Sequence, residues 1–440
     1  MNSSGTLEFT LPVPDFFICS LPRKTFRAGK ISVFSAGFII VNFREKLITE
    51  MHFMKQLFSF RISRFLIPAG IIFILISFVN PKSASAQNDY HFFQYTEPYL
   101  PDTTGNIYFA LDNTNFFKNN EYRGTIATGA TILGAWFRPK AVYYPTKQLR
   151  LELGVHVLKY TGRTDYENIS PWFTVRYHPT SAITVIMGNL DQDENHMLPE
   201  PVYDPQRFYT DKPQGGIQMK YETVKWYTDM WINWRQMILP GDPFQEKFSF
   251  GVMNKWTLLE NNTNQVAVPL SFFGTHAGGQ INSGPSMVRT YISVSPGIMY
   301  NHNTGGHFLT DIGTNDNLFI TTGPKDDTIS PFSKGSAVLL SGYVNTRLGD
   351  ITAAYWRAHH FYAPFGGILY QNVSSRYPGT AVENRELVNL KYHFDKLITP
   401  QTHLGFMFDL YYDTIEKKSM NAAGLYLVVN FGVIPRKKAH

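Results

Sequence analysis

The chain contains almost no cysteine. Its single cysteine among 440 residues is Cys19, which precedes a segment that we predict to be removed. The mature protein would then have no thiol, which excludes a disulfide framework, a thiolate metal site and a cysteine nucleophile. No cysteine follows that segment, and this argues against a lipoprotein anchored at a processed N-terminal cysteine.

Charged residues and long apolar runs are scarce as well. Asp, Glu, Lys and Arg make up 17% of the chain, whereas a typical soluble domain has about 25%. Aromatic residues make up 15%. A protein that crosses a membrane with helices shows apolar runs of about 20 residues, and the one long run here is Phe65–Val79. Membrane-spanning strands expose only alternate residues to lipid, so the composition permits a protein that crosses with strands.

The apolar run Phe65–Val79 has the features of a secretory signal. Basic residues precede it at Arg61 and Arg64, and the small residues Ser83–Ala86 follow it. A signal peptidase cuts after such a small-x-small pattern, so we expect the mature chain to start near Gln87. A retained transmembrane anchor is the alternative, but the run is short for a helix that needs about 20 residues.

The predicted signal divides the chain. A folded domain in front of a signal peptide would be unusual, so we interpret Met51 or Met54 as the true start and the preceding residues as a mis-called extension. The predicted parts are residues 1–53 as that extension, 54–86 as the cleaved signal peptide, 87–104 as a periplasmic arm or partial plug, 105–432 as a transmembrane barrel and 433–440 as a basic tail.

Residues Val224–Arg235 show the pattern that dominates the rest of the chain. Apolar side chains such as Trp226 and Trp234 alternate there with polar ones such as Lys225 and Asp229. A period of two is that of a β-strand with one apolar and one polar face. The segment therefore predicts a strand between lipid and water.

Sixteen segments with strand character are separated by connections that alternate between short and long. They are Asn106–Asp112, Arg123–Tyr144, Gln148–Tyr160, Trp172–His178, Ala182–Gly188, Gly216–Glu222, Val224–Arg235, Lys247–Leu258, Gln265–Phe273, Met287–Met299, His307–Thr321, Ser336–Arg347, Ile351–His360, Glu386–Asp395, Thr402–Tyr412 and Asn421–Gly432. Outer-membrane barrels have short periplasmic turns and long outer loops. We predict an all-β protein, a membrane-spanning antiparallel up-and-down β-barrel of about 16 strands (14–18).

A soluble all-β protein would show the same period of two, because one face of its strands is buried and the other solvated. Three features favour the barrel. The chain carries an export signal, most polar faces hold a lysine or arginine, and the mature length of 440 − 86 = 354 residues shows no obvious helical domain. A soluble sandwich of that length would more often divide into several domains.

The C-terminal run Gly424–Phe431 resembles the assembly signal of outer-membrane β-barrel proteins, a glycine followed by alternate hydrophobic residues that end in an aromatic one. The chain departs from that pattern because it continues with residues 432–440. As a whole it is similar to porin-like outer-membrane barrels of the Bacteroidetes type. The resemblance implies a location in the outer membrane of a Gram-negative bacterium and the barrel-assembly machinery as a partner.

Two segments contain residues that could carry chemistry. Asp191–His196 carries carboxylates at alternate positions but lacks the glycine and glutamate of a calcium-binding loop, so we predict no metal site there. Arg357, His359 and His360 form a possible rim site, which His276 from another loop could join, as in barrel enzymes that cut lipids or peptides. No Gly-x-Ser-x-Gly elbow accompanies them. We expect no enzyme activity and no cofactor.

The residues on the predicted polar faces indicate which side chains line the lumen and what charge it carries. Those predicted to line it are Arg150, Glu152, Arg176, Lys220, Lys225, Asp229, Arg235, Lys247, Lys255, Arg289, Arg347, Arg357, Lys391 and Asp409, and a possible aromatic track for sugars comprises Tyr227, Trp231, Tyr291, Tyr343 and Tyr411. Basic residues predominate, and rings of lysine and arginine favour anions. A passive or weakly selective, mildly anion-preferring diffusion channel for small solutes is therefore the main hypothesis.

The rival hypotheses are a barrel-embedded hydrolase and a structural or adhesive barrel with a blocked lumen. Expected partners are outer-membrane lipid and small solutes, with a homo-oligomer left open and no nucleic acid. We also expect that Leu151→Arg, which faces lipid, harms folding, whereas Glu152→Arg, which faces water, is tolerated. The sequence leaves open whether the loop Asn189–Gly215 folds inward as a constriction.

Overall fold

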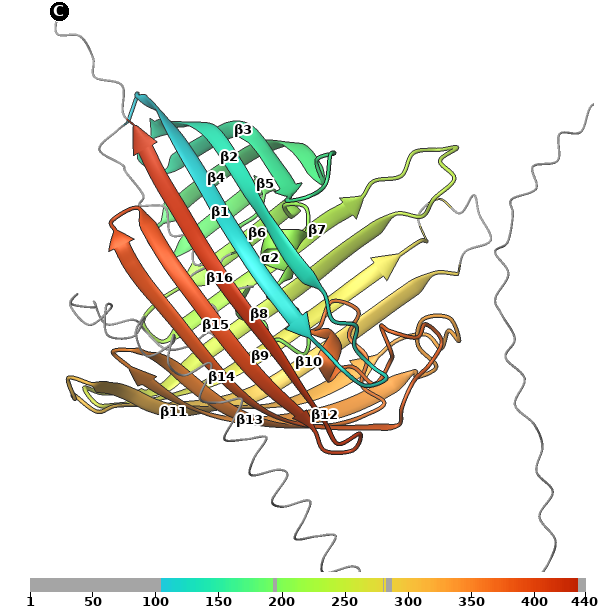
Figure 1. The fold of residues 1–440 in the computed structure, drawn as a ribbon. Coiled ribbons are helices and arrows are strands. Elements are labelled where there is room, and N and C mark those ends of the chain that lie inside the picture. The colour runs from blue at the N-terminus through green and yellow to red at the C-terminus, as the bar shows by residue number, and fades with distance from the viewer. Residues whose placement is uncertain (1–103, 193–195, 280, 282–286, 434–440) are drawn as a thin grey trace, which may run out of the picture. The chain divides into compact units, whose positions relative to one another are not determined.

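Sixteen antiparallel strands form one closed barrel in the computed structural model, which describes residues 104–192, 196–279, 281 and 287–433 (Figure 1). They are β1 (Ile107–Glu121), β2 (Thr131–Thr146), β3 (Leu149–Tyr160), β4 (Asn168–Thr180), β5 (Ile183–Asn189), β6 (Gly215–Glu222), β7 (Trp226–Gln236), β8 (Lys247–Glu260), β9 (Asn264–Ala277), β10 (Arg289–Asn303), β11 (Leu309–Thr322), β12 (Lys334–Thr346), β13 (Gly349–His359), β14 (Asn384–Thr399), β15 (Thr402–Asp413) and β16 (Lys418–Val433). Each strand pairs with the next in the chain, and β16 closes the barrel on β1. The predicted fold class and strand number are confirmed.

The strands have one apolar and one polar face, as predicted. On β3, Arg150 and Glu152 are buried on the inner face, whereas Leu153 is 65% exposed on the outer face. On β15, Phe408 and Leu410 are outward and Asp409 is inward. The outward apolar band is the surface that a membrane barrel presents to lipid, so the strands have the pattern of membrane-spanning strands.

Short turns gather at one end of the barrel and long loops at the other. Two residues join β2 to β3 and two join β12 to β13, whereas the β5–β6 and β13–β14 connections run over residues 190–214 and 360–383. The start of β1 and the end of β16 pair at Phe109↔Val433, at the short-turn end. By the rule for outer-membrane barrels this end is periplasmic and the loops are outside.

Several strand boundaries differ from the prediction. β1 continues to Glu121 instead of ending at Asp112, because its polar residues Lys118 and Asn120 occupy the inner face, where polarity is compatible with a strand. β2 starts at Thr131, and residues 122–130 form a loop. The predicted signal peptide, the N-terminal arm up to residue 103 and the tail from residue 434 lie outside the described residues.

Two of the long loops fold into the barrel. The β5–β6 loop carries the short helix α2 (Arg207–Thr210), and the β13–β14 loop carries the 3-10 turn η4 (Ile368–Tyr370). Buried apolar side chains of both loops pack against inward side chains of the strands. No helix in the described part of the chain is long and apolar enough to cross a membrane.

Candidate functional site

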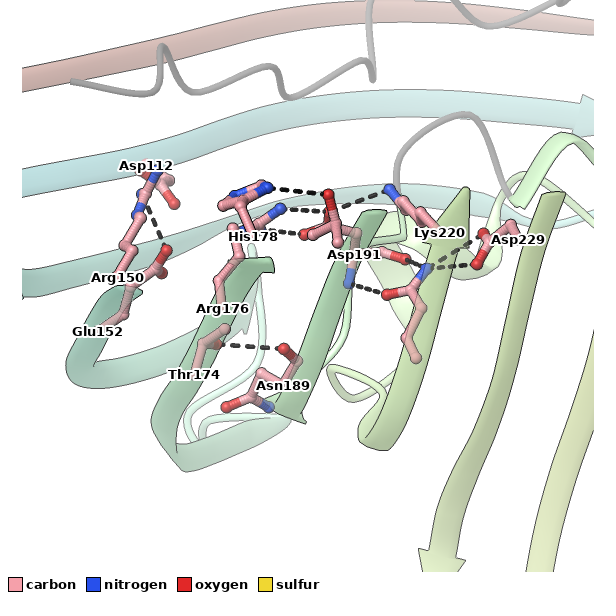
Figure 2. A network of polar contacts seen from close by, with 12 residues as sticks. Asp112, Arg150, Glu152, Thr174, Arg176, His178, Asn189, Asp191, Lys220 and Asp229 are labelled. Atoms are coloured by element: carbon pink, nitrogen blue, oxygen red, sulfur yellow. Dashed lines mark hydrogen bonds and ion pairs between the residues drawn. The ribbon is translucent and has the colours of Figure 1, made fainter. Parts of the chain in front are cut away.

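A ladder of charged side chains covers the inner wall of β1 to β4. Lys140 Nζ lies 3.0 Å from Asp112 Oδ2 and 3.2 Å from Glu152 Oε2, and Arg150 Nη2 lies 2.8 Å from Glu152 Oε1 (Figure 2 shows part of this wall). The indole N–H of Trp172 donates to Glu152 over 2.9 Å. Positive and negative side chains alternate along the wall, so each of these buried charges lies beside an opposite charge. Burial of a charged group away from water is tolerated only when it is paired in this way.

The start of the β5–β6 loop is fixed to this ladder through Asp191. Its carboxylate pairs with Arg176 of β4 and lies 3.0 Å from Lys220 Nζ of β6, as Figure 2 shows. Burial acts to raise the pKa of Asp191, but Arg176 and Lys220 outweigh it and hold this pKa well below its usual range. The ionised carboxylate of Asp191 thus pairs with two cations of the wall. In the described ranges, no group of acidic, histidine or cysteine residues could hold a metal ion.

His196 fastens the same loop to β7. Its Nδ1 lies 2.8 Å from Asp229 Oδ2, its Nε2 lies 3.2 Å from Gln214 Oε1, and its ring stacks on Trp231 with centroids 3.8 Å apart. The backbone here adopts φ of 55° at His196 and 56° at Met197, a region that non-glycine residues rarely occupy. Side-chain contacts therefore hold a backbone conformation that would not persist alone.

The loop then crosses to the opposite wall. Glu200 pairs with Lys391 of β14 and accepts a hydrogen bond of 3.1 Å from the hydroxyl of Tyr370 in the other loop. Burial raises the pKa of Glu200, although Lys391 acts in the opposite sense. On the wall behind, His393 Nε2 lies 3.0 Å from Asp409 Oδ1. The two inward loops are thus joined to each other and to β14.

Apolar side chains fill the space between the polar anchors. One buried cluster joins both loops to strands around most of the barrel, with members that include Ile186, Leu198, Tyr203, Trp231, Met253, Phe273, Phe319, Trp356, Phe365, Tyr370, Leu387, Tyr411 and Met420. A second cluster joins Tyr209 of α2 to β1, β2, β3, β15 and β16. Together they form an apolar plug across the lumen at the level of the loops; this plug is the candidate site.

Most of the residues predicted to line the lumen lie on inner faces of the strands. These are Arg150, Glu152, Arg176, Lys220, Asp229, Arg235, Lys247, Lys255, Arg289, Lys391 and Asp409. Three others do not. Lys225 and Arg347 lie in the short turns before β7 and after β12, because these strands are shifted or end earlier than predicted. Arg357 is on the outer face, since its neighbours Trp356 and Ala358 are the buried, inward residues of β13.

The aromatic residues predicted as a sugar track do not form a continuous exposed path. Trp231 is covered by His196, and Tyr291 packs edge-on against Tyr362 with centroids 5.3 Å apart. Tyr411 is buried and donates to Asp409 over 3.2 Å. Tyr343 and Tyr227 lie on inner faces nearer the periplasmic end, where the Tyr343 hydroxyl donates to Asn301 over 2.9 Å. These aromatic side chains therefore make packing contacts and hydrogen bonds within the plug and the wall.

The residues of the predicted rim site stay together at the outer end of β13, except for His276. His359 and Arg357 project outward, with His359 Nδ1 3.0 Å from Asn384 Oδ1 and Arg357 Nε 3.5 Å from Glu386 Oε1. The ring of His360 stacks on that of His359 with centroids 3.8 Å apart and on Phe332 with centroids 4.2 Å apart. His276 belongs to β9, four strands away, which corresponds to about 19 Å at the usual strand spacing. The structure thus separates His276 from His359 and His360.

Sequence reasoning missed the loop residues that build the plug. A signal was present in residues 199–209, where Val202, Tyr203, Phe208 and Tyr209 give the β5–β6 loop a share of apolar and aromatic residues that exposed loops rarely have. A period of two cannot detect such residues, because they do not lie on a strand.

The chain is similar to several solved structures of known proteins. The chain is similar to OprD of Pseudomonas aeruginosa (9% identity, 75% of this chain and 95% of that chain, TM-score 0.44). It is also similar to OprB of Pseudomonas putida (12% identity, 76% and 95%, TM-score 0.44) and to a loop-deleted OmpT of Vibrio cholerae (10% identity, 74% and 99%, TM-score 0.43). No curated protein sequence matches it significantly.

The family comparison covers the whole barrel. Residues 99–437 match the family described as Lipid A 3'-O-deacylase-type. This range includes all sixteen strands and both inward loops. The chain is therefore an outer-membrane β-barrel protein that belongs to the Lipid A 3'-O-deacylase-type family.

Proposed function

We propose that this barrel is a gated channel for small solutes, closed in the structure by the apolar plug of its two inward loops. The observation that carries the proposal is the contrast between the plug and the wall below it. The wall is lined by charged residues that pair with one another, whereas the plug consists of apolar side chains. Barrels of sixteen strands are wide enough for an aqueous lumen, and apolar constrictions gate by excluding water.

The charge of the lumen supports only a weak preference for anions. Five of the inward cations already face a carboxylate, namely Arg150, Arg176, Lys220, Arg289 and Lys391. Three of the partner carboxylates, those of Asp191, Glu200 and Asp326, belong to loops. The excess of positive charge on the predicted polar faces counts only strand residues and therefore omits these three negative charges. An ion in the lumen would therefore meet mainly neutralised pairs, and the excess of positive charge is smaller than the strand residues suggest.

Planar-bilayer recordings test this proposal. We expect low conductance with brief openings, and a small reversal potential of the sign of chloride preference under a potassium chloride gradient. Lys255→Glu, which reverses a charge on the inner face of β8, should shift that potential toward potassium. Lys225→Glu is the matched control, because Lys225 lies in a turn outside β7. A protein that never conducts, even with the plug weakened, would favour a structural barrel with a blocked lumen.

Hydrolysis of a lipid ester is the second candidate, and two observations favour it. The family description names a deacylase. At the outer end of β9, His276 Nδ1 lies 2.7 Å from the hydroxyl oxygen of Thr290, the geometry in which a base can activate a hydroxyl. Release of fatty acid from outer-leaflet glycolipid by the purified barrel would support it if His276→Ala abolishes release and His359→Ala does not. No release would reject it.

A further inference from the structure

Two adjacent strands are too short for the wall they belong to. β5 has 7 residues and β6 has 8, whereas β2, β14 and β16 each have 16. A tilted strand needs about 9 to 11 residues to cross the apolar part of a bilayer. Because β5 and β6 are joined at the periplasmic end to full-length neighbours, the missing residues are on the outer-leaflet side.

The pairing register shows how deep the missing part is. β4 begins at Asn168, but its pairing with β5 ends at Thr174↔Gly188. β5 itself ends one residue later, at Asn189 opposite Phe173, so residues 168–172 of β4 extend beyond β5, by about 17 Å along the strand. On the other side, the β6–β7 pairing ends at Gly216↔Asn233 while β7 continues to Gln236. The wall has a notch between β4 and β7.

The β4 edge of the notch is closed to further strand pairing. The backbone N–H of Phe173 donates to the side-chain oxygen of Asn189 over 2.8 Å, and at the end of β6 the N–H of Gly215 donates to the side-chain oxygen of Asn233 over 3.0 Å. Figure 2 shows Asn189 beside β4. Pro171, two residues along the β4 edge, has no N–H at all. Such edges do not accept an added β-strand, and this disfavours a partner protein that pairs there.

Among the residues that the structure describes, none continues β5 or β6 as a strand into the notch. Directly after β5, Leu190 is buried and Asp191 turns to the inward cations Arg176 and Lys220. Inside the barrel, Phe208 of α2 packs on Trp136 of β2 with centroids 6.0 Å apart. Both are part of, or packed against, the buried cluster that includes Leu158 of β3, which pairs with Asn168 of β4, so aromatic side chains lie close to the inner side of the β4 edge.

Apolar side chains surround the notch on the outside. Ile169 of β4 is 61% exposed and Met187 of β5 is 53% exposed. Ile217, Tyr166, Met237 and Leu239 are further exposed apolar residues on β6 and on the loops beside β4 and β7. Loops in water seldom expose this many large apolar side chains together. The border of the notch therefore suits hydrocarbon.

We propose that the notch between β4 and β7 is a lateral opening, through which an acyl chain of an outer-leaflet lipid reaches the inner side of β4 and α2. The notch lies at the height of the outer leaflet, its rim is apolar, and the capped β4 edge disfavours a strand as occupant. This site goes beyond solute passage along the barrel axis and does not depend on it, because the acyl chain enters from the side through a different part of the wall.

Quenching of a fluorescent label by lipids brominated in their acyl chains tests the opening. Ser170→Cys carries the label on the inner side of β4 above the end of β5, opposite His156 of β3. Ser293→Cys is the matched control, an inward serine on β10 with full-length strands on both sides. Leu153→Cys on the outer face gives the quenching of a fully lipid-exposed label.

We expect quenching at residue 170 to be several-fold stronger than at residue 293 and to approach that at residue 153. Heat-modifiability in gels confirms that each variant is a folded barrel. Equal, weak quenching at residues 170 and 293 would overturn the proposal. So would equal, strong quenching at both, since lipid would then enter through the barrel mouth and not from the side.

Discussion

Truncation of Tyr209 should open the barrel. Tyr209 is 1% exposed, its ring lies 4.8 Å from Phe116 and 5.6 Å from Tyr426 between centroids, and its hydroxyl lies 3.3 Å from that of Tyr426. Through these contacts Tyr209 connects α2 to β1 and β16. Removing a buried aromatic side chain costs about 3 to 5 kcal/mol, and these contacts exist only while the loop is inside the barrel.

The size of the effect follows from that cost. If about 3 kcal/mol is lost from the closed state alone, the ratio of closed to open channels falls roughly 100-fold, since each 1.4 kcal/mol is a factor of ten. Tyr209→Ala should therefore raise the open probability in planar-bilayer recordings by up to two orders of magnitude. Tyr209→Phe keeps the ring packing and should remain close to the wild type.

Tyr108→Ala is the matched control. Tyr108 is also a buried tyrosine on the inner face of the barrel, but it stacks on Tyr144 of β2 near the periplasmic end, with centroids 6.2 Å apart. Its truncation should lower stability without changing the open probability. If Tyr209→Ala and Tyr108→Ala behave alike, the inward loop does not close the channel, and the reasoning from the plug is refuted.

Three further predictions concern the wall and the start of the inward loop. Leu151→Arg places a charge toward lipid and should cost ~2 to 4 kcal/mol of folding free energy near the bilayer midplane, which heat-modifiability in gels will measure against Leu151→Phe. Glu152→Arg should also destabilise, by about 3 to 5 kcal/mol, because it leaves Lys140 and Arg150 facing a third cation, and normal folding would contradict this. The lowered pKa of Asp191 means that its stabilisation of the closed loop is complete above pH ~3.9 and is lost as pH falls through the lower folded-state pKa. Wild-type conductance should therefore rise on acidification below pH ~4, whereas Asp191→Asn should conduct more at neutral pH and respond little to acid.

The barrel could be predicted from the sequence because each strand carries its own period of two. Leu151 and Glu152 differ in polarity at adjacent positions, and only a strand with two different environments explains that alternation. The short and long connections gave the direction of the strands in the membrane. The end of a strand is less certain: Lys118 and Asn120 of β1 look like loop residues in sequence, yet the lumen tolerates them on an inner face.

The candidate site could not be predicted in the same way. Glu200 and Lys391 are 191 positions apart, and no local pattern links them. The sequence pattern predicts Arg357 on the polar, inward face of its strand, but Trp356 is the side chain that packs against the plug, and this fixes the register of β13. The expected tolerance of Glu152→Arg overlooked that the inner wall is a network of ion pairs and not a surface in free water.

The contact between Glu200 and Lys391 gives the most direct test of the claim that the loop lies inside the barrel. In the variant Glu200→Cys with Lys391→Cys, a short bifunctional thiol reagent should join the two positions, and the cross-linked protein should lose its channel openings. Glu200→Cys paired with Lys255→Cys, near the periplasmic end of β8, should not be joined. The account is contradicted if the first pair does not cross-link and residue 200 reacts freely with a membrane-impermeant thiol reagent in whole cells.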